Sequence, residues 1–421
     1  MARRVIFHID ANSAFLSWTA AYRVRVLGER QDLRDIPSVV AGDRASRKSI
    51  ILAKSVPAKK FGIHTGEPLF EALEKCPYLA VVEPSYGLYV EASRHMIGIL
   101  RRFSPVVEQY SIDEAWVDMT GTRLLYGSPV QAAQMLKDLI YRELGFTVNV
   151  GISNNKLLSK MAGDLKKPNL IHTLFPEEMG QKMWPLPVRE LFMVGQATER
   201  KLRQMGIVTI GELAQTDVKF LRKKLGKFGE TLWHFANGRC DDAVMKAPED
   251  NKGYGNSATL PFDVIDAQTG HQVLLSLCET VGMRMRRDGK YGRCVSVSLR
   301  TVDFADSSHQ RRLHGATDVT RELHYAACQL FDELWDSRTP LRQLGVQVTE
   351  LTNEGYCQFD LFRSAEPVKQ MRQLQLDEAV DGLREKYGED IVQRARFIGS
   401  AVTHMAGGLS KERRTGVTKQ V

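Results

Sequence analysis

The segment QYSIDEAWVDM (residues 109–119) places two adjacent acids inside a run of β-forming residues. Strands favour large apolar side chains, and successive side chains of a flat strand point to opposite faces. Asp113 and Glu114 would then lie on opposite faces, and burying one of them without a partner is costly. We infer that the chain bends here and that both acids serve one purpose. Two solvated acids at an ordinary turn are the alternative.

A third acid, Asp10, directly follows the apolar run VIFHI at the end of the first predicted strand. If VVEQY and AWVDM form a hairpin beside that strand, Asp10, Asp113 and Glu114 converge. Three converging carboxylates repel one another unless cations lie between them. Mg²⁺ prefers oxygen ligands, and two such ions activate a hydroxyl nucleophile and stabilise a leaving phosphate oxygen. The sequence therefore predicts a site for two Mg²⁺ ions.

The charge balance favours a polyanionic partner, most simply nucleic acid. The 421 residues carry a formal net charge of +8, and the pI is about 9.1. No apolar run reaches the roughly 18 residues of a membrane span, and MARRVIFHID is interpreted as a first strand rather than a signal peptide. We therefore expect a cytoplasmic protein that does not enter a membrane. The six cysteines are scattered singly, which indicates neither a zinc site nor a disulfide framework.

The chain is too long for one core, so two to four domains are expected. Residues 1 to about 173 mix strands and helices around one sheet, and residues 174–240 are helical in pattern. Residues 241–256 are polar and without periodicity, which is typical of a linker. After them the pattern is βαββαβ. Its elements are strand 257–261, helix 271–287, strand 294–304, a strand near 311–319, helix 321–336 and strand 341–351.

Four segments resemble the Y-family translesion DNA polymerases, and among them the bacterial members: HIDANSAF (8–15), AKKFGIHTGEPLFEALEKCP (58–77), YSIDEAWVDMTG (110–121) and TVNVGISNNKLLSKMAGDLKKPN (147–169). The resemblance implies an α+β multidomain fold, a right-hand polymerase with palm, small fingers, helical thumb and a βαββαβ little finger. It places the palm at 1–13 and 84–173, the fingers at 14–83, a thumb with a helix-hairpin-helix at 174–240, a linker at 241–252, the little finger at 253–351, and at 352–421 a C-terminal region ending in a disordered tail. The implied function is template-directed, low-fidelity extension of primers past damaged bases, using dNTPs.

The resemblance also implies roles for single residues at the catalytic site. Asp10, Asp113 and Glu114 match the metal ligands, joined by the backbone carbonyl of Ala11. Phe15 matches an aromatic steric gate whose ring would clash with a ribose 2′-OH; otherwise it is a core residue opening a helix.

Three further positions match the triphosphate site. Lys167 in KKPN matches the lysine that holds the triphosphate; taken alone, it is a solvated helix end. Lys59 and Ser13 stand where the family often has arginine and tyrosine near the phosphates. Ser13 departs from the pattern, as does Val56 near Lys59, so the triphosphate would depend more on Lys167 and on the amides of residues 13–15.

Primer-template DNA is the implied partner of the remaining domains. Gly195 and Ala197 occupy the hairpin turn of the thumb, where the second glycine of the usual pattern is missing; a plain packing unit is the alternative. Ser296, Ser298 and Arg300 alternate with apolar residues on a little-finger strand, which suits phosphate contact as well as plain solvation. QFDLF, with Gln358, Leu361 and Phe362, is similar to the peptide that binds the sliding clamp. Some family members need accessory polymerase subunits, and the resemblance leaves open whether this chain does.

Two rival functions would require a different set of residues from a polymerase. A non-catalytic DNA-binding accessory protein on the same fold would lack one of the acids, and all three are present. A two-metal nuclease would need neither the gate at Phe15 nor the lysine at Lys167.

Overall fold

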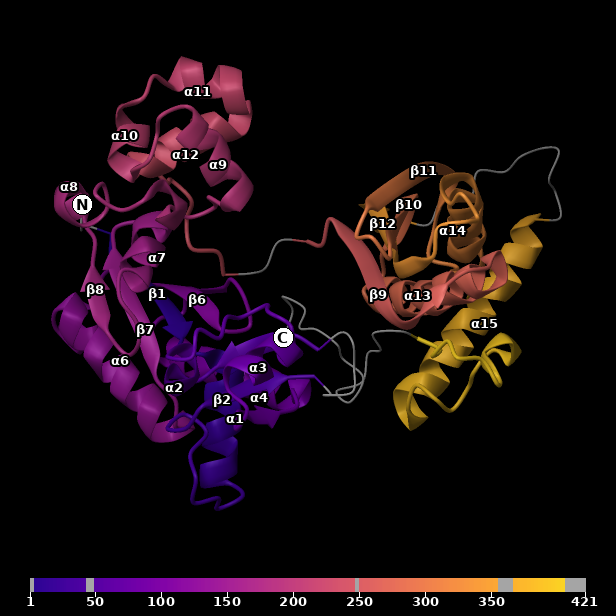
Figure 1. Cartoon of the computed structure of the whole chain (residues 1–421), viewed down its shortest axis with the longest axis horizontal. Coiled ribbons are helices and arrows are strands. Elements are labelled where there is room, and N and C mark those ends of the chain that lie inside the picture. The colour runs from indigo at the N-terminus through magenta and orange to yellow at the C-terminus, as the bar shows by residue number, and fades with distance from the viewer. Residues whose placement is uncertain (1–3, 43–48, 247–249, 355–365, 406–421) are drawn as a thin grey trace. The chain divides into compact units, whose positions relative to one another are not determined.

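The computed structural model of the chain describes residues 4–42, 49–246, 250–354 and 366–405. These residues form two compact units, one of 4–42 with 49–246 and the other of 250–354 with 366–405 (Figure 1). The peptide QFDLF and the tail from residue 406 lie outside the described residues. Among the described helices, none combines the length and the apolar character that crossing a membrane requires.

A five-stranded sheet forms the centre of the first unit, in the order β5-β6-β1-β7-β8. The strands are β5 (Val107–Gln109), β6 (Glu114–Asp118), β1 (Ile6–Ala11), β7 (Val148–Ser153) and β8 (Ile171–Thr173). β1 is antiparallel to both of its neighbours, and all six of its residues are buried. β5 and β6 pair as the antiparallel hairpin that the sequence predicted beside the first strand.

Helices cover both faces of this sheet. Phe7 and Ile9 of β1 belong to a core shared with residues of α1 (Ala14–Arg25), α4 (Tyr86–Phe103) and α6 (Pro129–Leu144). α7 (Lys156–Asp164) packs on β1 and β7. Its close approach requires Gly151, because a Cβ there would come within 2.0 Å of the carbonyl oxygen of Ser159. The short α5 (Arg123–Tyr126) contacts α6.

A second sheet and two small helices form another part of the first unit, between α1 and α4 in the sequence. Its order is β3 (Ile51–Lys54), β2 (Ser38–Ala41), β4 (Ala80–Val82), with β2 antiparallel to β3 and parallel to β4. α2 (Val56–Lys59) and α3 (Leu69–Lys75) close a separate small core against it. Ser55 caps α2 by accepting a hydrogen bond from the amide of Ala58.

Short helices follow from residue 176 and pack around one core. They are two 3₁₀ turns, Pro176–Glu178 and Val188–Glu190, and the α-helices α8 (Met179–Lys182), α9 (Gln196–Gln204), α10 (Ile210–Gln215), α11 (Val218–Leu225) and α12 (Lys227–Ala236). This core also contains Leu158 and Met161 of α7, so the helical part is fixed to the central sheet through that helix.

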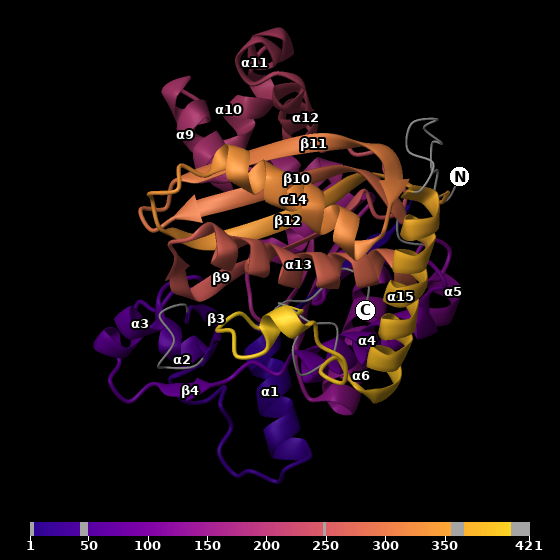
Figure 2. The same cartoon turned by 90° about the vertical axis from the view of Figure 1, so that its right-hand side faces the viewer.

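The second unit has the predicted βαββαβ order. Its strands are β9 (Gly253–Val264), β10 (Tyr291–Thr301), β11 (Asp306–Thr317) and β12 (Leu341–Thr352), in the sheet order β11-β10-β12-β9 with all pairs antiparallel. α13 (Ala267–Arg287) and α14 (Thr320–Leu334) lie side by side on one face of this sheet (Figure 2). Among the described residues of this unit, no helix lies on the other face.

The segment after β12 is joined to the second unit through buried charges. α15 (Glu366–Tyr387) and a 3₁₀ turn at Ala395–Phe397 follow β12 in the sequence. Glu279 of α13 is 1% exposed and accepts hydrogen bonds from Arg384 and Arg394. The sequence predicted a helix near 376–387, and the structure extends it toward the N-terminus.

Candidate active site

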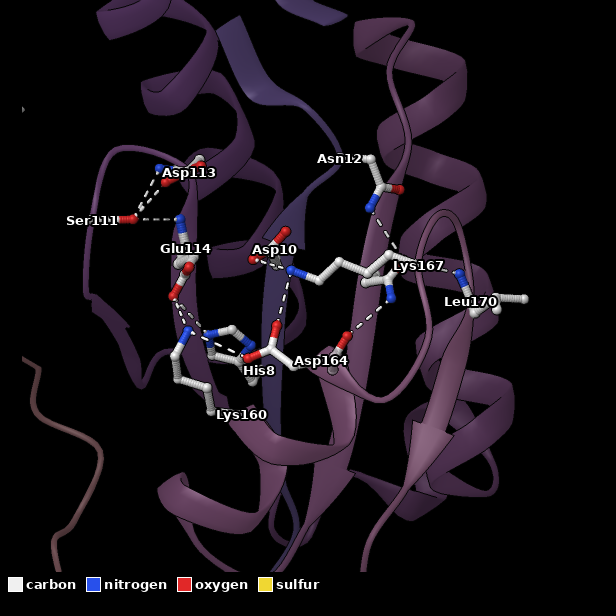
Figure 3. Close-up of polar contacts among 12 residues, drawn as sticks. His8, Asp10, Asn12, Ser111, Asp113, Glu114, Lys160, Asp164, Lys167 and Leu170 are labelled. Carbon is white, nitrogen blue, oxygen red and sulfur yellow. Dashed lines mark hydrogen bonds and ion pairs between the residues drawn. The ribbon is translucent and has the colours of Figure 1, made fainter. Parts of the chain in front are cut away.

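β1 and β6 bring two of the predicted acids side by side. The strands run antiparallel with Asp10 directly opposite Glu114, so both side chains leave the same face of the sheet. Asp113 immediately precedes β6, and its carbonyl accepts a hydrogen bond from the amide of Ala11 (3.0 Å). One end of β1 therefore gathers the backbones of all three acids (Figure 3).

The chain bends at the adjacent acids, as expected from their sequence. The hydroxyl of Ser111 donates to Asp113 Oδ1 (2.6 Å) and accepts hydrogen bonds from the amides of Asp113 (3.3 Å) and Glu114 (3.1 Å). This bend removes Asp113 from the alternation of β6. Both acids can then belong to one site without either being buried on the wrong face of a strand.

The carboxylate of Glu114 is held by the ammonium of Lys160 and the imidazole of His8. Lys160 Nζ lies 2.5 Å from Glu114 Oε2, and His8 Nε2 lies 3.2 Å from the same oxygen. Burial disfavours the charged form of Glu114, but the hydrogen bond from His8 and the charge of Lys160 outweigh burial and lower the pKa to about 2. Burial also lowers the pKa of His8. Glu114 is therefore ionised at neutral pH.

Asp10 is paired with the lysine predicted to hold the triphosphate. Lys167 Nζ lies 2.8 Å from Asp10 Oδ2 and 2.9 Å from Asp164 Oδ1. Burial raises the pKa of Asp10 to about 7, even with Lys167 beside it, and the charges of Glu114 and Asp113 add to this shift. Burial would lower the pKa of Lys167, but Asp10 and Asp164 outweigh it and raise that pKa. Asp10 is therefore not fully ionised at neutral pH.

A cavity of about 390 Å³ opens beside these acids, and it is lined mainly by β1, the start of α1, β3 and α2. Seven predicted site residues line it: Asp10, Ala11, Ser13, Phe15, Lys59, Asp113 and Lys167. Ala53 and Val56 also line it, whereas Glu114 does not. The cavity thus unites residues from segments that are far apart in the sequence.

The aromatic ring of Phe15 is fixed in the wall of this cavity. It stacks on Tyr89 with ring centroids 4.5 Å apart and an interplanar angle of 8°. The Tyr89 hydroxyl lies 3.1 Å from Thr19 Oγ1, which donates to the carbonyl of Phe15 (2.8 Å). Both the ring and the backbone of Phe15 are therefore held by one buried tyrosine and its partner.

Family models match most of the chain in three segments. The impB/mucB/samB family matches residues 9–164, its C-terminal domain matches residues 251–361, and the thumb domain of DNA polymerase iota matches residues 189–239. Among curated proteins, the DNA polymerase IV of Clostridium acetobutylicum is 44% identical over 392 residues, which cover 93% of this chain and 98% of that protein. The DNA polymerase IV of Clostridium kluyveri is 35% identical over 401 residues, covering 94% and 98% respectively.

The chain belongs to the Y family of DNA polymerases. A solved structure, the Y-family DNA polymerase chimera Dbh-Dpo4(243-245)-Dbh, has the same fold, with a TM-score of 0.70 at 20% sequence identity over 83% of this chain and all of that one. The expected right-hand polymerase architecture is confirmed.

A Y-family fold implies divalent metal, and the donor atoms present fit such an ion. Asp10 and Asp113 line the cavity together with Ala11, whose carbonyl is a further hard oxygen donor. However, the described residues contain no group of three or more acids, histidines or cysteines already arranged as ligands. In the described residues Glu114 contacts Lys160 and His8, and Asp10 contacts Lys167, so the convergence of the three carboxylates on metal stays a prediction.

Two of the predicted DNA contacts lie at the start of a thumb helix. Gly195 is the N-cap of α9, and Ala197 is the second residue of that helix. A Cβ on Gly195 would meet no atom within 4 Å, so the structure does not require a glycine for internal packing there. A helix N-terminus such as this one suits the approach of a phosphate.

The predicted alternation on β10 is confirmed. Val295, Val297 and Leu299 are buried, whereas Ser298 is exposed on the face that lacks helices. In register across the four strands, Ser298 has small neighbours: Ser308 on β11, Gly345 on β12 and, beyond it, Ser257 on β9. Ser296 lies in the next row on this face. Arg300 is paired with Asp306 at 2.6 Å rather than free.

Sequence reasoning missed several residues of the site. Lys54 and Thr65 line the cavity, and burial lowers the pKa of Lys54, with the nearby charge of Lys59 adding to the shift. Lys54 belongs to SIILAKS, where alternation along the predicted strand would have placed it beside Leu52. Lys160 and His8 gave no signal, because their role depends on partners far along the chain.

Proposed function

We propose that the cavity beside β1 and β6 is where this Y-family DNA polymerase joins a dNTP to a primer. The primer 3′ oxygen forms a bond to the α-phosphorus, the bond to the bridging oxygen breaks, pyrophosphate leaves and the hydroxyl proton passes to solvent. Asp10, Asp113 and Glu114 are the catalytic acids in this proposal. Its main support is that Asp10 stands opposite Glu114 in the sheet while Asp113, Phe15 and Lys167 line one cavity with Asp10.

We further propose that the metal is Mg²⁺ and that two ions bind. Asp10, Asp113, Glu114 and the carbonyl of Ala11 would hold them. When bound, the ions lower the pKa of the primer hydroxyl and neutralise charge on the phosphates. To bind an ion, Glu114 would exchange its contact with Lys160 for one with the metal. Its carboxylate is already ionised, so it would not first have to lose a proton.

The triphosphate would be held by groups on two sides of the cavity. Lys167 offers a charged ammonium, and its contacts to Asp10 and Asp164 keep it at the cavity wall. The first amides of α1 have no partner within the helix, and the side chain of Ser13 does not cap them. A helix N-terminus of this kind attracts phosphate oxygens. Lys59 and Lys54 would add positive charge from the opposite wall.

The enzyme acts in translesion synthesis, and the wall of its cavity suits that role. Ala53 and Val56 are small residues where a polymerase would cover the nascent base pair, so a damaged base would meet little obstruction. Phe15 would exclude ribonucleotides because its ring, stacked on Tyr89, has little freedom to move aside. We also propose that the domains have the limits that the resemblance implies.

The enzyme acts on primer-template DNA, and we propose where it touches the duplex. Gly195 and Ala197 would approach a phosphate from the thumb. Ser296 and Ser298 would face the backbone from the open sheet of the second unit, where the small residues across the strands allow close approach. Arg300 would first exchange its partner Asp306 for a phosphate. These contacts provide affinity without reading sequence.

Two further partners are proposed from the sequence. Gln358, Leu361 and Phe362 would dock on the sliding clamp, with the two apolar side chains filling a pocket. Accessory polymerase subunits would be needed only if the isolated chain does not extend a primer. Because its substrate is DNA, we propose a cytoplasmic location.

Primer extension by the isolated chain with Mg²⁺, on plain and damaged templates, tests the proposal. We expect Asp113→Ala with Glu114→Ala to slow extension by about two orders of magnitude or more, because the acids act on charge in the transition state. Binding of primer-template, measured by fluorescence anisotropy, should persist.

The chain provides a matched control in Asp241 and Asp242, another adjacent acid pair, which is exposed. The same double substitution there should leave extension unchanged. Extension by the Asp113 and Glu114 variant at the normal rate would refute the catalytic assignment.

A further inference from the structure

The loop between α7 and β8, residues 165–170, carries Lys167 and is held from outside by three buried side chains. These are Asn12, at the end of β1, Asn149 on β7 and Lys137 on α6, all less than 10% exposed. We call them the anchor residues. None of them belongs to the loop itself, and the sequence alone gave none of them a role in binding substrate.

Asn149 uses all of its hydrogen-bonding capacity on the loop and its surroundings. Its amide nitrogen donates to the carbonyls of Lys166 (2.7 Å) and Gly163 (3.0 Å). Its oxygen accepts from the amide of Leu170 (3.2 Å) and from Asn12 (3.1 Å). A buried asparagine with both donors and both acceptor sites satisfied defines a single orientation. It therefore fixes the loop on both sides of Lys167.

Asn12 links this arrangement to the strand that carries Asp10. Its oxygen accepts from the amide of Asn169 (2.9 Å) and from the hydroxyl of Thr147 (3.0 Å). Asn12 lies two residues after Asp10, so the segment that carries the first catalytic acid also holds the loop (Figure 3). The distance of 2.8 Å between Lys167 and Asp10 follows from this connection.

Of the three anchor residues, Lys137 costs the most free energy to bury. Its ammonium donates to the carbonyl of Asn169 (2.5 Å), and burial lowers its pKa. A buried ammonium is unfavourable unless it satisfies a group that would otherwise be unpaired. Lys137 therefore holds the loop at Asn169 from the α6 side, opposite the contact from Asn12.

We propose that Asn12, Asn149 and Lys137 are positioning residues that set the affinity for the dNTP triphosphate through Lys167. The inference rests on the proposed function, because it assumes that Lys167 binds the phosphates. Without an anchor, Lys167 would sample positions away from the cavity wall, and binding would lose part of one charge-assisted contact. The reaction step itself would change little.

Single-nucleotide incorporation and equilibrium dNTP binding to the enzyme–DNA complex provide the test. We expect Lys137→Met to raise the KM and the Kd for dNTP about tenfold, which corresponds to about 1.4 kcal/mol, while kcat changes little. Asn12→Ser should act in the same direction from the other side of the loop and serves if Lys137→Met does not fold. Met135→Ala, at an exposed position on α6, should leave both constants unchanged.

A double-mutant cycle separates this inference from the proposed function. Lys167→Ala alone should raise the KM for dNTP, and Lys137→Met should add nothing further in that background, because both changes remove the same contact. An unchanged KM in Lys167→Ala would overturn the assignment of Lys167. The inference alone would be overturned if Lys167→Ala raises the KM as expected but the anchor variants do not behave as predicted. That would be the case if Lys137→Met and Asn12→Ser have no effect, or if their effects add to that of Lys167→Ala.

Discussion

Asp113 and Glu114 are neighbours in sequence, yet their surroundings differ. Glu114 keeps its place in strand β6 and meets Lys160 and His8, while Asp113 lies in the bend stabilised by Ser111. The bend could be predicted, because two acids among β-formers conflict with a flat strand. The direction of the Glu114 carboxylate could not, because Lys160 is 46 residues away and His8 is 106 residues away.

Phe15 provides a prediction at the scale of a single residue. Phe15→Ala should increase the use of ribonucleotides relative to deoxyribonucleotides by about tenfold or more, because it removes the ring that overlaps a 2′-OH. The ratio of kcat/KM values for matched dNTP and rNTP measures this. Phe220→Ala, in a thumb helix away from the cavity, is the control and should keep the wild-type ratio. An unchanged ratio in Phe15→Ala would remove the gate assignment.

At the scale of an element, α4 supports the gate from behind. Tyr89 on this helix is fully buried and stacks on Phe15. We expect Tyr89→Leu to reduce sugar selectivity about fivefold, since an aromatic pair contributes roughly 1 kcal/mol. Tyr89→Phe keeps the ring but loses the contact with Thr19, so it should retain most of the selectivity. Equal selectivity in all three proteins would contradict this support.

Local patterns and long-range contacts differed in how well they could be predicted. The hairpin of β5 and β6 and the βαββαβ order of the second unit follow from alternation and helical periodicity within short windows. Both were therefore predicted correctly. The anchoring of the Lys167 loop was not, because it depends on Asn12 and Asn149 meeting across a sheet. Isolated asparagines carry no periodic signal that reveals such a partner.

α14 begins beside a buried acid whose titration should affect stability. Burial raises the pKa of Asp318 to about 6, against the opposing charge of Arg286. The folded chain therefore binds more protons than the unfolded chain between about pH 4 and 6, and Asp318 makes stability fall as the pH rises through that range. Asp318→Asn should be more stable than wild type at pH 8, by about 1–3 kcal/mol, with no gain near pH 4.

Urea unfolding of the second unit at both pH values measures this difference. The exposed Asp303→Asn on the same unit is the control and should give no gain at either pH. A gain from Asp318→Asn that is equally large at pH 4 would show that its origin is not the ionised carboxyl.

At the scale of the whole molecule, the described residues build separate cores in the two units. The catalytic acids, the gate and the anchor residues all belong to the first unit, and the open sheet proposed to face DNA belongs to the second. A change inside one core should therefore leave the other intact. The function proposed here requires both units, but their stabilities should be separable.

Glu279 allows that separation to be tested. Glu279→Gln would leave Arg384, which is 4% exposed, without its counter-charge, at a cost of roughly 3–5 kcal/mol. We expect faster hydrogen exchange in α13 and α15 and unchanged exchange in β1 and β7. Glu333→Gln, which breaks the exposed pair with Arg311, should change exchange in neither unit because exposed pairs contribute little. Faster exchange in β1 or β7 of the Glu279 variant would mean that the two units share stability, whereas unchanged exchange in α15 would mean that the buried charges do not hold the C-terminal helix.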